Sequence, residues 1–189
     1  MESNITPKVK MLVDKKKYKI SRFNKNMYKV DSFIENKNIY VERVFTFDLI
    51  KLTYQMNRSL FDRVETLVVD ENNQLLFVLM KPMLQNLGVL QRYFSIKLTK
   101  TIGEDNSVCF TGIPYHEYAK SLGVPNAAIH SPITKLTFIC NKLSMHSFHL
   151  IYLIELEDAF YMHSLFEKIF ISLLKDCTKN TIHAVEQIF

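Results

Sequence analysis

The stretch that decides the fold is the C-terminal segment from Leu156 to Phe189, which reads LEDAFYMHSLFEKIFISLLKDCTKNTIHAVEQIF. Apolar side chains recur on one side of it at helical spacing, and most of the charged side chains fall elsewhere. The apolar stripe comprises Met162, Phe166, Ile169, Phe170, Leu173 and Cys177, before a last turn through Ile182, Val185 and Ile188. We therefore predict one long amphipathic helix, with Glu157 and Asp158 at its positively polarised first turn.

The segments before this helix are mostly strand-like, and none predicts a partner helix of similar length. The expected strands cover residues 18–22, 27–34, 39–47, 64–69, 74–80, 92–99, 108–113, 133–143 and 148–156. A short helix capped by Asp48 follows the third of them, and residues 114–131 read as an irregular connection. A wide apolar stripe must be covered by another layer. We therefore predict an α+β fold, in which a curved antiparallel sheet wraps around the C-terminal helix.

Length and composition predict one globular domain. The chain has 189 residues, of which 48% are hydrophobic and 12% aromatic, enough for a core and a cavity. We divide it into a basic lead-in, residues 1–17, which is loose or a short helix up to residue 16, and a single domain, residues 18–189. Three cysteines without C-x-x-C spacing argue against disulfides and a zinc site. With no signal peptide or membrane span recognised, we expect a cytoplasmic monomer.

The positive charge is concentrated near the N-terminus. Residues 1–30 carry nine Lys or Arg against two acidic residues, a net charge of +7, whereas the rest of the chain carries −2 of the total of +5. Lys15, Lys16, Lys17 and Lys19 could contact anionic membranes, so that the protein would lie transiently at membrane surfaces. The alternative is a solvated lysine-rich face. With only four glycines in the chain, we expect no RNA-binding tail and no nucleic-acid partner.

The loop from Lys81 to Leu90 is unusually apolar. Loops rarely expose so much apolar surface unless it packs on something or binds something. We expect this loop to pack on the C-terminal helix and to act as a gate, through Met83, Leu84, Leu87 and Val89.

Three groups of residues give the chain a resemblance to the START (StAR-related lipid-transfer) family. Residues 58–64, RSLFDRV, are similar to the family's R-x-x-W-D-x-x-V, with Phe61 in place of Trp and a shortened last spacing. Lys81-Pro82, the apolar loop and residues 91–94, QRYF, are similar to K-P…S-x-R-D-F, with Tyr93 in place of Asp. The strand 151–155 corresponds to the family's T-x-V-T-Y strand, without its Thr residues. The resemblance covers residues 18–188 and implies a helix-grip fold with a lipid-sized tunnel.

Known catalytic motifs are absent from the sequence. It contains no G-x-S-x-G, Walker or dinucleotide-binding motif, and His116-Glu117 lacks the second histidine of a metalloprotease. Cys140 reads as a small core side chain, and His146 and His149 read as turn and surface residues rather than metal ligands. We therefore expect no catalysis, no metal and no cofactor.

A tunnel between sheet and helix would be lined by apolar groups, with a few polar ones that fix a headgroup. Polar candidates are Arg43, Arg92, Thr111, Asn141 and Glu155, and Arg92 is the strongest because it aligns with the family's arginine. Structural ion pairing is the alternative role for Arg92, and plain core packing is the alternative for the apolar residues. The predicted lipid-binding residues are Arg92, Phe94, Ile96, Phe110, Phe138, Asn141, Tyr152, Ile154, Phe166, Ile169, Phe170 and Leu173.

The resemblance favours an intracellular protein that holds one lipid, such as a phospholipid or a sterol, and moves it between membranes. Two alternative functions are also compatible with the sequence. One is a non-catalytic interaction module with a filled core and a basic partner-binding face, and the other is a helix-grip enzyme.

Overall fold

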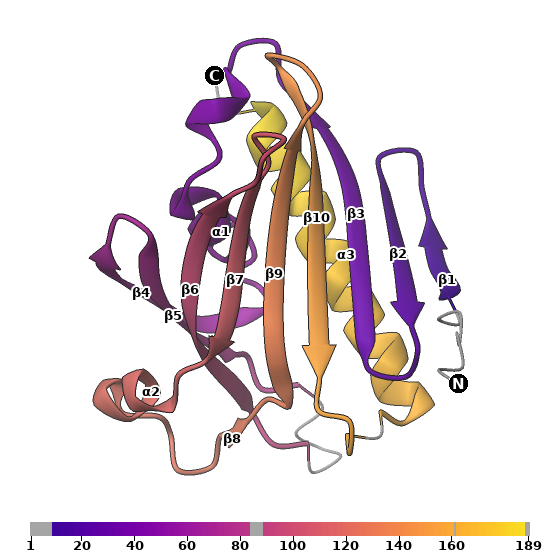
Figure 1. Ribbon diagram of the computed structural model, residues 1–189. Helices are drawn as coiled ribbons and strands as arrows, with labels where there is room; N and C mark the ends of the chain where they lie inside the picture. Colours follow the sequence, from indigo (N-terminus) through magenta and orange to yellow (C-terminus); the bar gives the residue numbers. More distant parts are fainter. Residues whose placement is uncertain (1–8, 84–88, 161, 188–189) are drawn as a thin grey trace, which may run out of the picture.

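The structure is a computed structural model of the chain, and it describes residues 9–83, 89–160 and 162–187. Its main feature is a ten-stranded sheet that curves around the C-terminal helix α3 (Ser164–Gln187). Figure 1 shows α3 running along the inner face of the sheet, behind β3 (Met27–Glu35) and β10 (Ser147–Leu156). This arrangement confirms the predicted α+β helix-grip architecture.

The strands follow one another in the spatial order β1-β2-β3-β10-β9-β7-β6-β5-β4. Neighbours along this path are antiparallel, and a short strand, β8 (Ile129–His130), pairs in parallel with β6. The other strands are β1 (Val9–Asp14), β2 (Tyr18–Phe23), β4 (Phe61–Asp70), β5 (Asn73–Met80), β6 (Arg92–Ile102), β7 (Val108–Pro114) and β9 (Ile133–Lys142).

Polar contacts fix both ends of α3 to the sheet. Near its N-terminus, Glu167 accepts hydrogen bonds from Arg22 at 2.5 Å and from the Tyr28 hydroxyl at 3.1 Å. Near its C-terminus, the side-chain amide of Asn36 donates to the carbonyl oxygen of Val185 at 2.7 Å. Because these contacts come from β2, β3 and the turn after β3, the helix is held in one direction across the sheet.

Helix α1 (Phe47–Gln55) packs beside α3 through a buried amide pair. Asn180 donates to the side-chain oxygen of Asn57 at 2.7 Å, and the Asn57 amide donates to the carbonyl oxygen of Thr53 at 2.6 Å. Asn57 is fully buried, and these bonds satisfy the polar ends of its side chain. The two helices therefore form one layer against the inner face of the sheet.

The main hydrophobic core lies between the inner face of the sheet and these helices. A smaller cluster lies on the outer face, where Tyr118 and Ala119 of α2 (His116–Leu122) cover Leu75, Phe77 and Leu79 of β5. Most of the buried apolar side chains belong to the main core between sheet and helices.

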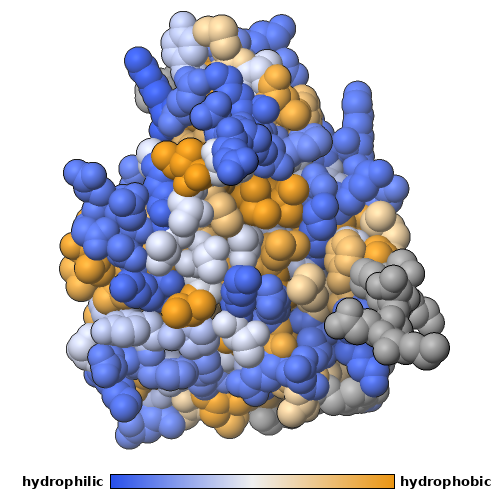
Figure 2. Space-filling view, in the orientation of Figure 1, coloured by the Kyte–Doolittle hydropathy of each residue, from blue (hydrophilic) through white to orange (hydrophobic). Residues whose placement is uncertain are grey.

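The surface in Figure 2 is mostly hydrophilic, with separate hydrophobic patches. Within the described part of the chain, no helix is long and apolar enough to cross a membrane.

The C-terminal helix begins at Ser164, so the predicted start near Leu156 is wrong. Leu156 still pairs with Ile133 of β9, and the backbone N–H of Glu157 donates to the carbonyl oxygen of Pro132 at 2.9 Å. These bonds keep the backbone extended past the point where helical spacing of apolar residues begins. The acidic residue in the first turn is accordingly Glu167, rather than Glu157 or Asp158.

The predicted strand at residues 39–47 is also wrong. A 3-10 helix, Val41–Arg43, occupies this segment, and its first N–H donates to the carbonyl oxygen of Met145 at 3.0 Å. Val41 and Phe45 are buried, so apolar alternation here reflects side chains that enter the core from turns. The cap of α1 is Thr46, whose hydroxyl accepts from the N–H of Asp48, and not Asp48 itself.

Two further segments are more regular than the sequence predicts. Residues 9–14 form β1, which pairs with β2, so the expected loose or helical lead-in is wrong there. The connection at 114–131 contains α2 and β8 instead of being irregular throughout. Gly123 ends α2 with a φ of 67°, a left-handed conformation that suits glycine.

Candidate functional site

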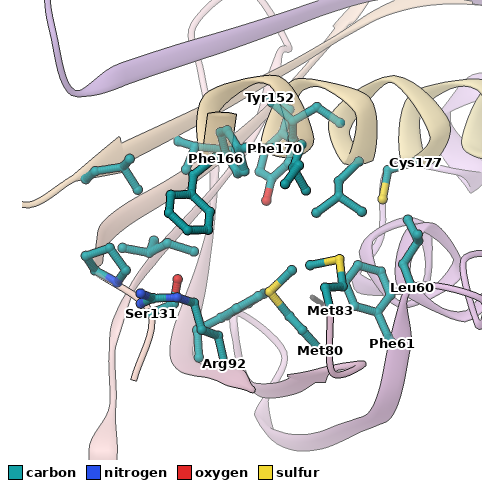
Figure 3. Close-up of a pocket in the computed structure, with 18 of the residues that line it drawn as sticks. Leu60, Phe61, Met80, Met83, Arg92, Ser131, Tyr152, Phe166, Phe170 and Cys177 are labelled. Carbon is teal, nitrogen blue, oxygen red and sulfur yellow. The ribbon is translucent and has the colours of Figure 1, made fainter. Parts of the chain in front are cut away.

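A cavity of about 620 Å³ lies between the inner face of the sheet and α3. Its wall is mainly apolar. It contains residues from the helices α1 and α3 and from the strands β3, β4, β5, β6, β8, β9 and β10. The volume falls within the range of roughly 300–1,000 Å³ that is usual for small-molecule sites. Figure 3 shows side chains from α3 on one side of this space, facing side chains from the sheet and adjoining loops on the other.

Most of the predicted lipid-binding residues line this cavity. Those of the strands point inward because each occupies the inner register of its strand, and those of α3 belong to the predicted apolar stripe. That these residues contact a lipid stays a prediction. The predicted residues that line the cavity are Arg92, Phe94, Phe138, Tyr152, Ile154, Phe166, Ile169, Phe170 and Leu173.

Ile96, Phe110 and Asn141 do not line the cavity, which corrects the predicted wall. Ile96 and Phe110 face inward but lie in the filled core, where the Phe110 ring is 5.2 Å from the ring of Phe47. Asn141 lies on β9 next to buried Cys140, so its side chain points to the outer face. Inward alternation identifies a core face but does not show where that face borders empty space.

Arg92 is the first residue of β6 and borders the cavity with its guanidinium group (Figure 3). Its Nη1 lies 3.5 Å from the carbonyl oxygen of His130, and its Cζ lies 5.9 Å from the centre of the Phe160 ring. Burial lowers the pKa of Arg92 from its usual value, yet a guanidinium remains charged at neutral pH. Within residues 9–83, 89–160 and 162–187, no carboxylate forms an ion pair with it.

The remaining polar candidates do not reach the cavity. Arg43 stacks on the ring of Tyr40 at 5.7 Å, and the Thr111 hydroxyl contacts the thiol of Cys109. Glu155 forms an ion pair with Lys135 at 3.7 Å. Arg92 is thus the one predicted headgroup residue that the structure places at the cavity.

Two tyrosines bring a pair of hydroxyl groups to the mainly apolar wall. The hydroxyls of Tyr54 on α1 and Tyr152 on β10 lie 3.1 Å apart, and Figure 3 shows the Tyr152 hydroxyl pointing into the cavity. Phe138 stacks on the Tyr152 ring at 4.3 Å and fixes its direction. Desolvation raises the pKa of both tyrosines well above their usual value, so both are neutral and can donate a hydrogen bond.

Sequence reasoning missed several wall residues. Leu60 and Phe61 line the cavity and lie inside the motif RSLFDRV, whose likeness to the family motif does not indicate a position at a cavity wall. Met80 lines it from the last position of β5, and Tyr54 lines it from α1. The apolar periodicity of residues 49–56 predicts the helix α1, but it does not indicate that Tyr54 on this helix faces a cavity.

The predicted gate loop is only partly covered by the structure. Met83 and Val89 line the cavity at the two ends of the loop, as does Leu90. Leu84 and Leu87 lie outside the described residues. The gate stays a prediction.

The four lysines expected at membranes lie around the β1–β2 connection. Lys15 and Lys16 are exposed in the connection itself. Lys17 forms an ion pair with Glu186 of α3 at 2.7 Å, and Lys19 forms one with Asp14 at 3.6 Å. Their role at membranes is a prediction that their positions do not test.

The described residues contain no group of three or more His, Cys, Asp or Glu side chains that could hold a metal ion. Burial raises the pKa of Cys177, which lines the cavity, to about 12. Because the thiolate is the nucleophilic form, this thiol is a poor nucleophile at neutral pH. The cavity therefore offers hydrogen bonding and the positive charges of Arg92 and of the exposed Lys81, and its thiol is not an evident nucleophile.

No protein-family model and no curated protein matches this sequence. Solved structures do match its fold. Human StAR-related lipid transfer protein 5 superposes with a TM-score of 0.70 at 12% identity, covering 97% of this chain and 88% of that one. A STAR-related lipid transfer protein from Xanthomonas axonopodis gives 0.68 at 12% identity, covering 95% and 99%. The chain therefore has the START helix-grip fold, as the sequence resemblance predicted.

A helix-grip enzyme matches less closely. The Zhui aromatase/cyclase of a Streptomyces strain superposes with a TM-score of 0.50 at 8% identity, covering 84% of this chain and 91% of that one. The fold therefore occurs both in lipid transfer proteins and in an enzyme, and function has to be argued from the cavity.

Proposed function

We propose that this protein binds one lipid in the cavity beneath α3 and carries it between membranes without changing it chemically. The observation that carries the proposal is a mainly apolar cavity of about 620 Å³, bordered by a guanidinium without a carboxylate partner among the described residues. The solved structures with this fold that are named lipid transfer proteins agree with it.

The apolar body and the polar end of a lipid match the apolar lining of the cavity and its Arg92 side chain. Aromatic and aliphatic side chains from the sheet and from α3 would cover the acyl or ring portion, with about 25 cal/mol of favourable free energy for each Å² of apolar surface removed from water. Arg92 would pair with an anionic or polar headgroup, because a partly buried cation without a negatively charged partner is costly. A ligand with one polar end and one apolar body satisfies both.

Transfer of a fluorescent lipid from donor to acceptor vesicles tests the proposal. We expect transfer well above the protein-free rate for at least one of phospholipid, sterol, ceramide or fatty acid, with the recovered lipid chemically intact. Transfer at the protein-free rate for all four classes would contradict it, and a modified product would favour an enzyme instead.

The loop 81–90 is proposed to be the gate through which the lipid passes. Met83 and Val89 line the cavity at the two ends of this loop, and lids of this kind move on microsecond to millisecond timescales. We expect that joining Met83→Cys to Phe166→Cys with a short thiol cross-linker stops lipid exchange while a preloaded lipid stays bound. The measurement is release of a preloaded fluorescent lipid, with Cys109, Cys140 and Cys177 replaced by serine or alanine in the background.

The uncross-linked double variant is the matched control for the gate, since it carries the same substitutions without the restraint. Exchange should return when a cleavable cross-linker is cut. Equal exchange before and after cross-linking would place lipid uptake elsewhere on the molecule.

The basic connection between β1 and β2 is proposed to bring the protein to anionic membranes. The protein would be cytoplasmic and would bind the membrane surface as a peripheral protein. We expect Lys15→Glu with Lys16→Glu to slow transfer from phosphatidylserine-containing vesicles severalfold at low salt. The effect should be small with neutral vesicles or at high salt, because the Debye length falls to about 3 Å at 1 M salt. Stopped-flow transfer at several salt concentrations measures it.

Lys15 and Lys16 are the sharper pair for this test, because Lys17 and Lys19 already form ion pairs with Glu186 and Asp14. Reversing Lys17 would also set like charges together and weaken the attachment of α3. The control is Lys120→Glu, which reverses one exposed lysine on α2 that forms no salt bridge among the described residues. Equal slowing under all conditions would point to fold damage, and no slowing would leave the lysines as a solvated face.

A further inference from the structure

The Tyr54–Tyr152 pair has an unused hydrogen-bond donor. Two phenol hydroxyls carry two protons between them, and their mutual bond at 3.1 Å uses one. Among the described residues, neither hydroxyl has a second hydrogen-bond partner. Whichever tyrosine donates to the other, one O–H group is therefore left to point at whatever fills the cavity.

The other hydroxyls near this pair are already engaged. Thr53 on α1 donates to the carbonyl oxygen of Leu49 at 2.9 Å, and Thr178 on α3 donates to that of Leu174 at 2.7 Å. These threonines satisfy their own helices, so their protons are not available to a ligand. The tyrosine pair differs because its hydroxyls bond only to each other and border the cavity.

The surroundings of the pair make a missing acceptor costly. Tyr54 is only 4% exposed, and Tyr152 is held by its stack on Phe138. A hydroxyl that is taken out of water without an acceptor loses the hydrogen bond it made to water, which a ligand oxygen at this point would restore. A ligand that is purely hydrocarbon here would leave the donor unpaired.

Arg92 and the tyrosine pair lie on different elements, β6 for the arginine and α1 with β10 for the tyrosines. Figure 3 shows Arg92 and Tyr152 on different sides of the space, with apolar side chains around them. The site therefore offers a fixed positive charge at one place and a neutral hydrogen-bond donor at another.

We propose that the Tyr54–Tyr152 pair is a second polar subsite, which selects lipids with a hydrogen-bond-accepting oxygen within their apolar body. A ketone, ester, ether or hydroxyl oxygen would meet it, at a distance from the headgroup set by the spacing of the two subsites. This inference rests on the proposed function, since it concerns the lipid that the cavity would hold.

The test compares stearate with a set of isomeric ketostearates, in which one ketone is moved along the chain. Each probe displaces a fluorescent fatty acid from the full-length protein. The carboxylate serves Arg92 in every probe, and only the ketone can serve the tyrosines. We expect one position of the ketone to bind about 3- to 10-fold more tightly than stearate, the worth of one net hydrogen bond.

The variant Tyr54→Phe with Tyr152→Phe should lose the preference, so that it binds every ketostearate no more tightly than it binds stearate itself. Tyr18→Phe is the matched control, because it removes a buried hydroxyl outside the cavity and should keep the preference. If the double variant melts at a markedly lower temperature, the same displacement measurement is made with Tyr152→Phe alone, which should also weaken the ketone preference.

The outcomes separate the two claims. Stearate binding without a preferred ketone position, or a preference that survives in the double variant, would overturn the tyrosine subsite and leave the proposed function standing. Failure of the fluorescent fatty acid and of vesicle-delivered phospholipid, sterol and ceramide to bind the wild type would overturn the proposed function, and the subsite with it.

Discussion

Replacing Arg92 by methionine is expected to weaken binding of an anionic lipid by about 30-fold or more. Methionine keeps much of the apolar stem but removes the charge, and truncating one partner of a buried charge pair costs about 2–5 kcal/mol. Arg92 has no carboxylate partner among the described residues, so its removal leaves no unpaired carboxylate there. Titration with a fluorescent fatty acid measures the loss.

The control for this variant is Arg43→Met, which removes an exposed arginine that stacks on Tyr40 away from the cavity. It should bind as tightly as the wild type. Arg92→Lys should fall between the two, because lysine keeps the charge but loses the planar two-pronged geometry. Undiminished binding by Arg92→Met would show that the guanidinium serves the fold and not the ligand.

Replacing Leu173 by tryptophan is expected to abolish lipid binding while the protein stays folded. Leu173 lies on α3 and lines the cavity, so the larger side chain can extend into empty space instead of displacing packed neighbours. The filled cavity should no longer admit a lipid, and vesicle transfer should fall to the protein-free rate. The melting temperature should stay the same or rise.

Ser172→Trp is the matched control, since it adds the same side chain to the exposed side of the same helix. It should transfer lipid at the wild-type rate. Normal transfer by Leu173→Trp, with the protein stable, would mean that the ligand does not occupy the space beneath α3.

Alternating apolar residues were a reliable guide wherever a strand has one buried face. The strands β6, β9 and β10 show this pattern, and their predicted ranges agree closely with the observed ones. The same pattern failed at residues 39–47, since turns can also send Val41 and Phe45 into a core. Helical spacing of apolar residues likewise predicted a helix start at Leu156, several residues before the observed start. Leu156 is still paired with β9, and this backbone pairing decides where the chain leaves the sheet.

The cavity was harder to predict than the fold. Periodicity identified the inner faces, but Phe94 borders empty space while Ile96, two residues on, lies in the filled core. That difference depends on packing by residues distant in the sequence, such as Phe47 against Phe110. The position of Tyr54 could not be predicted for the same reason. Its hydrogen bond to Tyr152 joins α1 to β10, which are far apart in the sequence.

Native mass spectrometry of the protein as purified from cells, followed by extraction and identification of any bound molecule, tests the central claim most directly. We expect one lipid per protein chain, released intact on denaturation and absent from Leu173→Trp. A wild-type protein that carries no lipid, and takes up none from phospholipid, sterol, ceramide or fatty-acid vesicles, would contradict it.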